Sequence, residues 1–135
     1  MELERKMRKL HYLVAFAVLA FSVPAYSQAT AESLFRTDVA DVTNQEIVVL
    51  EVTYPPGNKS ASHRHNAHTI VYVLEGRVTM AVEGGERKTL GPGEVFYESP
   101  ADVHTVSMNA SDTEPARILV FFLKEKGAAT TEPAD

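Results

Sequence analysis

Short runs of β-branched and aromatic residues, separated by Gly/Pro-rich turns, constrain the fold of this chain more than any other feature. Such runs are favoured in strands, and the sequence predicts strands at residues 47–54, 69–74, 77–83, 87–90, 94–98, 103–108 and 117–123. Turn residues separate them at Pro55-Pro56-Gly57, Glu75-Gly76, Gly84-Gly85 and Gly91-Pro92-Gly93. No segment after residue 27 has a helical period. The pattern therefore predicts an all-β sandwich or barrel.

The segments on either side of these strands have a different composition. Residues 28–45 are rich in Ala, Thr, Ser and Asp, with only scattered apolar residues, so we expect an N-terminal arm that lies against another surface. The last predicted strand, 117–123, is apolar throughout, as a strand buried on both faces would be. Residues 125–135 are predicted to form a flexible tail. Since the chain has 135 residues, one domain at residues 46–124 is expected.

The N-terminus has the pattern of a secretory signal peptide. Arg8 and Lys9 precede a short apolar run at residues 13–21, and Ala25-Tyr26-Ser27 forms a small-x-small cleavage site. A membrane anchor is the alternative, but the run is shorter than the ~20 residues that a span needs. We expect residues 1–27 to be removed, which predicts a secreted or periplasmic protein without a stable membrane anchor.

Charge and cysteine content exclude several classes of function. Of the 13 basic and 18 acidic residues, four and two lie in residues 1–27, which leaves nine and 16 and a net charge of −7. An acidic domain repels phosphate backbones and anionic lipids, so nucleic acid is not an expected partner. The chain has no cysteine, which excludes disulfides, thiolate catalysis and zinc–thiolate sites.

Three histidines form the candidate metal site. His63 and His65 are one residue apart, so on a strand both point to the same face. His104 follows a separate turn region that ends at Ser99-Pro100. Neutral imidazole binds zinc, copper, iron and nickel, and a small barrel can bring three imidazoles to one ion. The alternative is an exposed polar loop with solvated histidines, in keeping with the neighbouring Ser60, Ser62, Arg64 and Asn66.

The spacing of these residues resembles the two motifs of the cupin superfamily. The first motif reads Gly-(x)5-His-x-His-(x)3,4-Glu-(x)6-Gly, and Gly57, His63, His65 and Gly76 are in register with it. The second reads Gly-(x)5-Pro-x-Gly-(x)2-His-(x)3-Asn, and Gly93 and His104 match it. The departures are Ser99 and Ala101 in place of Pro and Gly, Pro100 and Asn109 each displaced by one residue, and Thr69 in place of the metal-binding Glu.

The resemblance implies a single jelly-roll (cupin) β-barrel preceded by the signal peptide. It implies one divalent transition metal (Fe, Mn, Ni, Cu or Zn) bound by His63, His65 and His104. It also implies small-molecule oxidation, similar to the quercetin-dioxygenase-like small cupins. Because cupins host many activities on one fold, a non-catalytic small-ligand-binding protein and a metal-dependent isomerase or lyase stay open. Cupins commonly pair through their sheets, so a homodimer is expected, with the arm available to cross to the partner.

Thr69 leaves the fourth ligand position without an obvious occupant. If the strand continues from His65 without a bulge, Thr69, Val71 and Val73 face inward and His68 faces outward. A one-residue bulge would instead bring His68 to the metal; otherwise His68 lies in solvent or at a dimer interface. Glu98 is the candidate catalytic residue, as a ligand, a general base or an acceptor for an imidazole N–H. Its alternative is a surface glutamate at a strand end.

The mouth of the barrel is expected to be largely apolar, as small-molecule pockets are. The candidates to line it are Met80, Phe96, Tyr97, Met108 and Phe121, for each of which ordinary core packing is the alternative. Alternation along residues 95–97 means that only part of this group can face inward.

Overall fold

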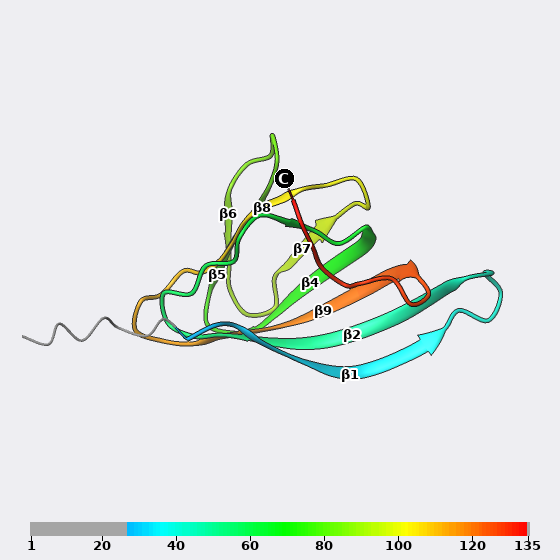
Figure 1. Ribbon diagram of the computed structural model, residues 1–135. Helices are drawn as coiled ribbons and strands as arrows, with labels where there is room; N and C mark the ends of the chain where they lie inside the picture. Colours follow the sequence, from blue (N-terminus) through cyan, green and yellow to red (C-terminus); the bar gives the residue numbers. More distant parts are fainter. Residues whose placement is uncertain (1–26, 135) are drawn as a thin grey trace, which may run out of the picture.

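A computed structural model describes residues 27–134, and these residues form ten strands and no helix (Figure 1). The strands are β1 (Thr30–Asp38), β2 (Gln45–Tyr54), β3 (His63–Arg64), β4 (Ala67–Glu75), β5 (Val78–Val82), β6 (Lys88–Leu90), β7 (Val95–Glu98), β8 (His104–Asn109), β9 (Ala116–Glu125) and β10 (Glu132–Pro133). All seven predicted strands are present, with ends that differ by two residues or fewer. The all-β prediction is confirmed.

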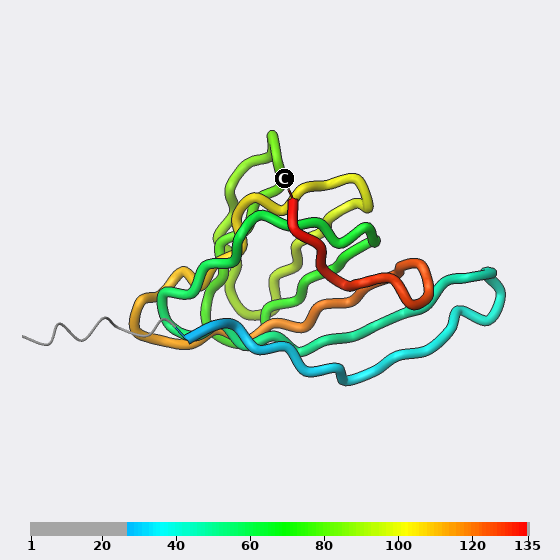
Figure 2. The backbone as a smooth tube through the Cα atoms, in the orientation of Figure 1, coloured from blue at the N-terminus to red at the C-terminus, as the bar shows by residue number. Residues whose placement is uncertain are grey.

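The strands form two five-stranded antiparallel sheets that face each other (Figures 1 and 2). One sheet has the order β1-β2-β9-β4-β7, and the other has the order β10-β3-β8-β5-β6. The core between them contains the residues that alternate inward along β2, β4 and β9, together with most of β5. The fully buried apolar residues are Val48, Ala67, Val71, Val73, Val78, Met80, Ala116, Ile118 and Phe122.

Both ends of the described chain differ from the sequence-based expectation. The expected arm contains strand β1, which pairs with β2 of the same chain along its whole length. The expected flexible tail turns back from β9 and ends in β10, which pairs with β3 on the opposite sheet (Figure 2). Composition misled in both cases, because backbone pairing with a neighbouring strand needs few apolar side chains.

Strand β9 is not buried on both faces. Its burial alternates, and Phe121 and Leu123 point outward and are exposed. Their cross-strand partners Val49, Ile47 and Ile70 share that outer face. The run is apolar throughout because one face belongs to the core and the other to an uncovered apolar surface.

Asn109, one residue late in the second motif, closes one end of the barrel. Its buried side-chain amide donates to the carbonyls of Tyr54, Pro55 and Glu114, and its Oδ1 accepts from the Ser111 N–H. These bonds connect the end of β2 to the loop before β9. Although Asn109 is displaced by one residue from the motif position, its side-chain amide still stabilises this end of the barrel.

We expect Gly76→Ala to destabilise the fold more than Gly84→Ala. Both glycines have positive φ, +70° and +72°, so each alanine costs about 1–2 kcal/mol of backbone strain. A Cβ on Gly76 would also lie 2.5 Å from the Pro115 carbonyl oxygen, whereas nothing lies within 4 Å of a Cβ on Gly84. The close contact adds about 1–3 kcal/mol, measurable by urea denaturation of the two variants. Equal losses would contradict this account.

The predicted signal peptide and its cleavage site lie outside the described residues, except for Ser27. Among residues 27–134, no helix is long and apolar enough to cross a membrane.

Candidate metal centre

The fold brings the three histidines of the two motifs together. His63 begins β3 and His104 begins β8, and the two residues are directly paired across the strands. His65 follows β3 immediately, before Asn66, whose positive φ of 49° separates β3 from β4. One nitrogen from each ring lies within 4.8 Å of the others. The convergence predicted from the spacing is therefore seen in the structure.

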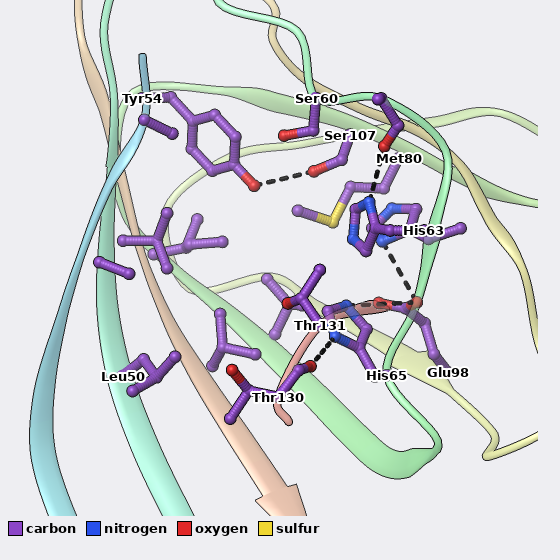
Figure 3. A pocket seen from close by; sticks show the side chains of 18 of the residues that line it. Leu50, Tyr54, Ser60, His63, His65, Met80, Glu98, Ser107, Thr130 and Thr131 are labelled. Atoms are coloured by element: carbon purple, nitrogen blue, oxygen red, sulfur yellow. Dashed lines mark hydrogen bonds and ion pairs between the residues drawn. The ribbon is translucent and has the colours of Figure 1, made fainter. Parts of the chain in front are cut away.

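Two of the imidazoles are oriented by backbone carbonyls. His63 Nδ1 lies 2.8 Å from the Ala61 oxygen, and His65 Nδ1 lies 2.6 Å from the Thr130 oxygen (Figure 3). A carbonyl only accepts, so Nδ1 carries the proton in both rings and Nε2 keeps its lone pair free. This is the tautomer that a metal ligand needs.

The environment also favours the neutral form of His63. Burial lowers the pKa of His63 below its usual value, and the nearby His104 and His65 lower it further. Metal binding requires an imidazole without its second proton. At neutral pH, His63 is therefore ready to bind a cation without first losing a proton.

Glu98 lies beside the histidines, on β7. It is buried, and it is the direct cross-strand partner of Thr69, so the two side chains share the inner face of the sheet. Its Oε2 is 3.2 Å from His104 Nδ1 and 3.9 Å from His65 Nε2. A carboxylate thus reaches the region where the family motif has its glutamate, from the neighbouring strand.

The residues present fit a metal ion. Both nitrogens of His104 and Oε1 of Glu98 are buried without a hydrogen-bond partner, since the 3.2 Å contact between His104 Nδ1 and Glu98 Oε2 is not a hydrogen bond. An unsatisfied buried polar atom costs about 1–3 kcal/mol, so three in one place need an explanation. His65 Nε2 and the Glu98 carboxylate are two acceptors facing each other, which a cation would satisfy together. Three imidazoles and a carboxylate form a donor set for a divalent transition metal.

Thr69 and His68 are placed as parity predicts. Thr69, Val71 and Val73 are buried and face inward, even though the strand is interrupted at Asn66. His68 is exposed on the outer face, where its ring is hydrogen-bonded to the Tyr97 hydroxyl at 2.8 Å. No bulge brings His68 to the cluster, so it is not a fourth ligand in this structure.

A pocket of about 410 Å³ opens onto the histidine cluster. Its apolar walls come mainly from the inner faces of β2 and β9, with Leu50, Val52, Ile118, Val120 and Phe122. On the side away from Glu98, the Tyr54 hydroxyl and Ser107 Oγ are 2.8 Å apart (Figure 3). Burial raises the pKa of Tyr54 above its usual value, so the phenol stays protonated. The pocket has two polar ends, one of histidines and Glu98 and one of Tyr54 and Ser107.

Only Met80 of the five predicted lining residues lines this pocket. Phe96 packs in the core, stacked on His104 with ring centroids 6.0 Å apart, while Tyr97 and Phe121 lie on the outer face. Met108 does not line it either. The prediction selected large residues without regard to the strand on which they lie. Alternation along β2 would have indicated the correct residues, because Leu50, Val52 and Tyr54 share the inner face with Val48.

Comparison with known families identifies the domain. The model of the cupin domain matches residues 50–122, which contain His63, His65, Glu98 and His104. This chain belongs to the cupin family.

Two curated cupins have similar sequences. Quercetin 2,3-dioxygenase of Bacillus subtilis (strain 168) is 30% identical over 93 residues, which cover 67% of this chain and 27% of the enzyme. A cupin-domain-containing oxidoreductase of Neurospora crassa is 36% identical over 80 residues, which cover 59% of this chain and 40% of that protein. The matched region thus spans less than half of either relative.

Solved structures agree on the fold. An uncharacterised double-stranded β-helix protein from Klebsiella pneumoniae superposes with a TM-score of 0.62 at 24% identity, covering 90% of this chain and 97% of that one. The DMSP lyase DddQ from Ruegeria pomeroyi superposes with a TM-score of 0.58 at 23% identity, covering 65% of this chain and 43% of the lyase. At these identities the likeness concerns the fold.

Proposed function

We propose that this cupin is a metal-dependent, dioxygenase-like oxidoreductase that acts on a small, mostly apolar organic molecule carrying an oxygen ligand for the metal. The observation that carries the proposal is the convergence of three imidazoles and the buried Glu98 carboxylate, whose Oε1 has no hydrogen-bond partner, at one end of a mostly apolar pocket. The similarity to quercetin 2,3-dioxygenase and to a fungal oxidoreductase supports the same class of reaction.

His63, His65 and His104 would hold the metal, which supplies Lewis acidity and, for iron, manganese, nickel or copper, redox chemistry. Glu98 accepts the proton of a substrate hydroxyl as that oxygen becomes anionic. The walls of β2 and β9 exclude water from the reacting carbon. Tyr54 and Ser107 hydrogen-bond a second oxygen of the substrate and so set its direction along the pocket.

The experiment is oxygen uptake by the metal-loaded protein with flavonols, catechols and β-diketones, one class at a time. Oxygen consumed in proportion to product supports the proposal. Turnover without oxygen uptake would assign a metal-dependent isomerase or lyase instead. Binding of these compounds without any turnover would assign a ligand-binding protein. Thr69 in place of the motif glutamate favours that alternative, because loss of a metal ligand weakens a catalytic centre.

We also propose that the protein is exported, with residues 1–27 as its signal peptide. The charged start, the short apolar run and the small residues before position 28 support this. N-terminal sequencing of the protein from its native host tests it, and an intact N-terminus in a cytoplasmic fraction would contradict it.

The outer face of the sheet β1-β2-β9-β4-β7 supports a homodimer. A continuous row of directly paired side chains crosses all five strands on this face: Phe35, Val49, Phe121, Ile70 and Tyr97. Glu51, Arg117 and Glu75 form ion pairs at one end of the face. An apolar centre with a charged margin is the usual make-up of a protein interface. We propose that a second copy of this chain covers it.

We expect Ile70→Glu to weaken this dimer by at least about 30-fold, since a charge in the centre of an apolar interface costs ~2 kcal/mol or more. Light scattering over a dilution series measures the effect. Val42→Glu is the matched control, because Val42 is exposed and apolar but lies in the turn between β1 and β2. A monomeric mass for the unmodified protein at micromolar concentration would contradict the proposed dimer.

A further inference from the structure

The C-terminal residues 126–134, here called the C-terminal strap, cross from one sheet to the other beside the histidines. The strap leaves the end of β9 and finishes as β10 against β3 (Figures 1 and 2). Three of its residues, Thr130, Thr131 and Pro133, line the pocket. The strap therefore forms one wall of the candidate site.

Four contacts join the strap to the segment that carries His63 and His65. The Thr130 carbonyl accepts from His65 Nδ1 at 2.6 Å (Figure 3), and Asn66 Nδ2 donates to Glu132 Oε2 at 2.8 Å. Pro133 is the strand partner of His63, and the Ala134 N–H donates to the Ser62 carbonyl at 3.2 Å. Together with the strand pairing of Glu132 and Arg64, these contacts reach every position from residue 62 to residue 66.

The start of the strap is fixed by a buried ion pair between β2 and β9, in the sheet opposite β3. The Lys124 ammonium, fully buried, lies 2.8 Å from Glu46 Oε1 and also donates to the carbonyls of Glu125 and Ala128 at 2.9 and 2.5 Å. The Gly127 N–H donates to the same Glu46 oxygen. The hydrogen bond from Lys124 is the largest cause that holds the pKa of Glu46 at about 2, far below its usual value. The turn at residues 125–128 is thus tied to the Glu46 carboxylate, whose low pKa keeps it ionised at neutral pH.

We propose that the strap is part of the metal centre, with the Thr130 carbonyl as the group that fixes the tautomer and direction of the His65 ring. Without that acceptor, His65 Nδ1 faces solvent, and the ring is free to rotate and to exchange its proton between the two nitrogens. Acceptors of this kind behind a ligating imidazole typically contribute 10–100-fold to metal affinity. The buried pair Glu46–Lys124 is a positioning element that acts through the strap. The inference rests on the proposed metal site.

The test compares zinc or cobalt affinity, by competition with a chromophoric chelator, for the full chain and for a variant that ends at Ala128. That variant retains the Lys124–Ala128 contact but lacks Thr130 and β10. We expect affinity about 10–100-fold weaker. The matched control ends at Pro133, keeps Thr130 and β10, and is expected to bind within about two-fold of the full chain. Equal affinity of the Ala128-ended variant and the full chain would overturn the proposal while leaving the metal site intact.

A second readout does not depend on bound metal. In the metal-free full chain, the His65 Nδ1–H should give a slowly exchanging proton resonance, which the Ala128-ended variant loses. Absence of that resonance in the full chain would overturn the role of Thr130. The full-length variant Glu46→Gln/Lys124→Met leaves no buried lone charge and should weaken metal affinity in the same direction. Unchanged affinity in this variant would remove the ion pair from the proposal. A full chain that binds no metal would overturn the proposed function itself, and with it the role of the strap.

Discussion

A variant carrying both His63→Ala and His104→Ala is expected to lose its transition metal almost completely. The two imidazoles are direct strand partners, and together they supply two of the three nitrogens that converge within 4.8 Å. One remaining imidazole and one carboxylate cannot compete with solvent and buffer for the ion. We expect the content of iron, manganese, nickel, copper or zinc to fall from about one equivalent to below about 0.1, measured by elemental analysis.

His68→Ala is the matched control for this experiment. It removes an imidazole five residues along the chain from His63, but that ring lies on the outer face and contacts Tyr97. Its metal content should equal that of the unmodified protein. Metal lost from His68→Ala as well, or retained by the double variant, would mean that the ion is bound elsewhere. Metal absent from all three samples after reconstitution would favour the ligand-binding function.

The fold and the histidine cluster were accessible from the sequence because both follow from local periodicity. Alternation and turn residues placed seven strands, and the parity of residues 63–73 predicted which side chains face inward. That parity survives the interruption at Asn66, since Ala67, Thr69, Val71 and Val73 are all buried. The alternation of inward and outward side chains along a strand can be predicted without knowing which strand pairs with it.

The features that the sequence did not reveal depend on long-range pairing. Strand β1 is exposed along its whole length and is held by backbone bonds to β2, so its composition resembles that of a loop. Strand β10 has two residues and pairs with β3 across nearly 70 positions of the chain. The position of Glu98 opposite Thr69 likewise depends on the register between β7 and β4. No local pattern contains that register.

Glu98→Gln is expected to retain the metal and to lose most of the activity. Gln has nearly the same shape, but it carries no charge and cannot accept a proton. The three imidazoles remain, so metal content should stay near one equivalent. If Glu98 acts as the general base of the proposed reaction, turnover falls by about 10²–10⁴-fold. The measurement pairs elemental analysis with kcat on whichever substrate class supports oxygen uptake.

Metal content and kcat together separate the roles open to Glu98. Metal retained with a lower kcat supports the general base. Metal lost from Glu98→Gln would instead make the carboxylate a ligand, and unchanged kcat would remove Glu98 from the mechanism.

The exchange variant Thr69→Glu/Glu98→Thr tests whether a carboxylate is needed in the site or only at position 98. The two residues are direct cross-strand partners on the inner face, and such side chains start about 5 Å apart. The exchange conserves the side chains present and moves the carboxylate to the position of the family motif. We expect it to recover part of the activity that Glu98→Gln loses, with metal still bound. If a folded, metal-loaded exchange variant recovers no activity, the carboxylate is needed at position 98 on β7. A carboxylate at position 69 on β4 would then approach the substrate from the wrong side.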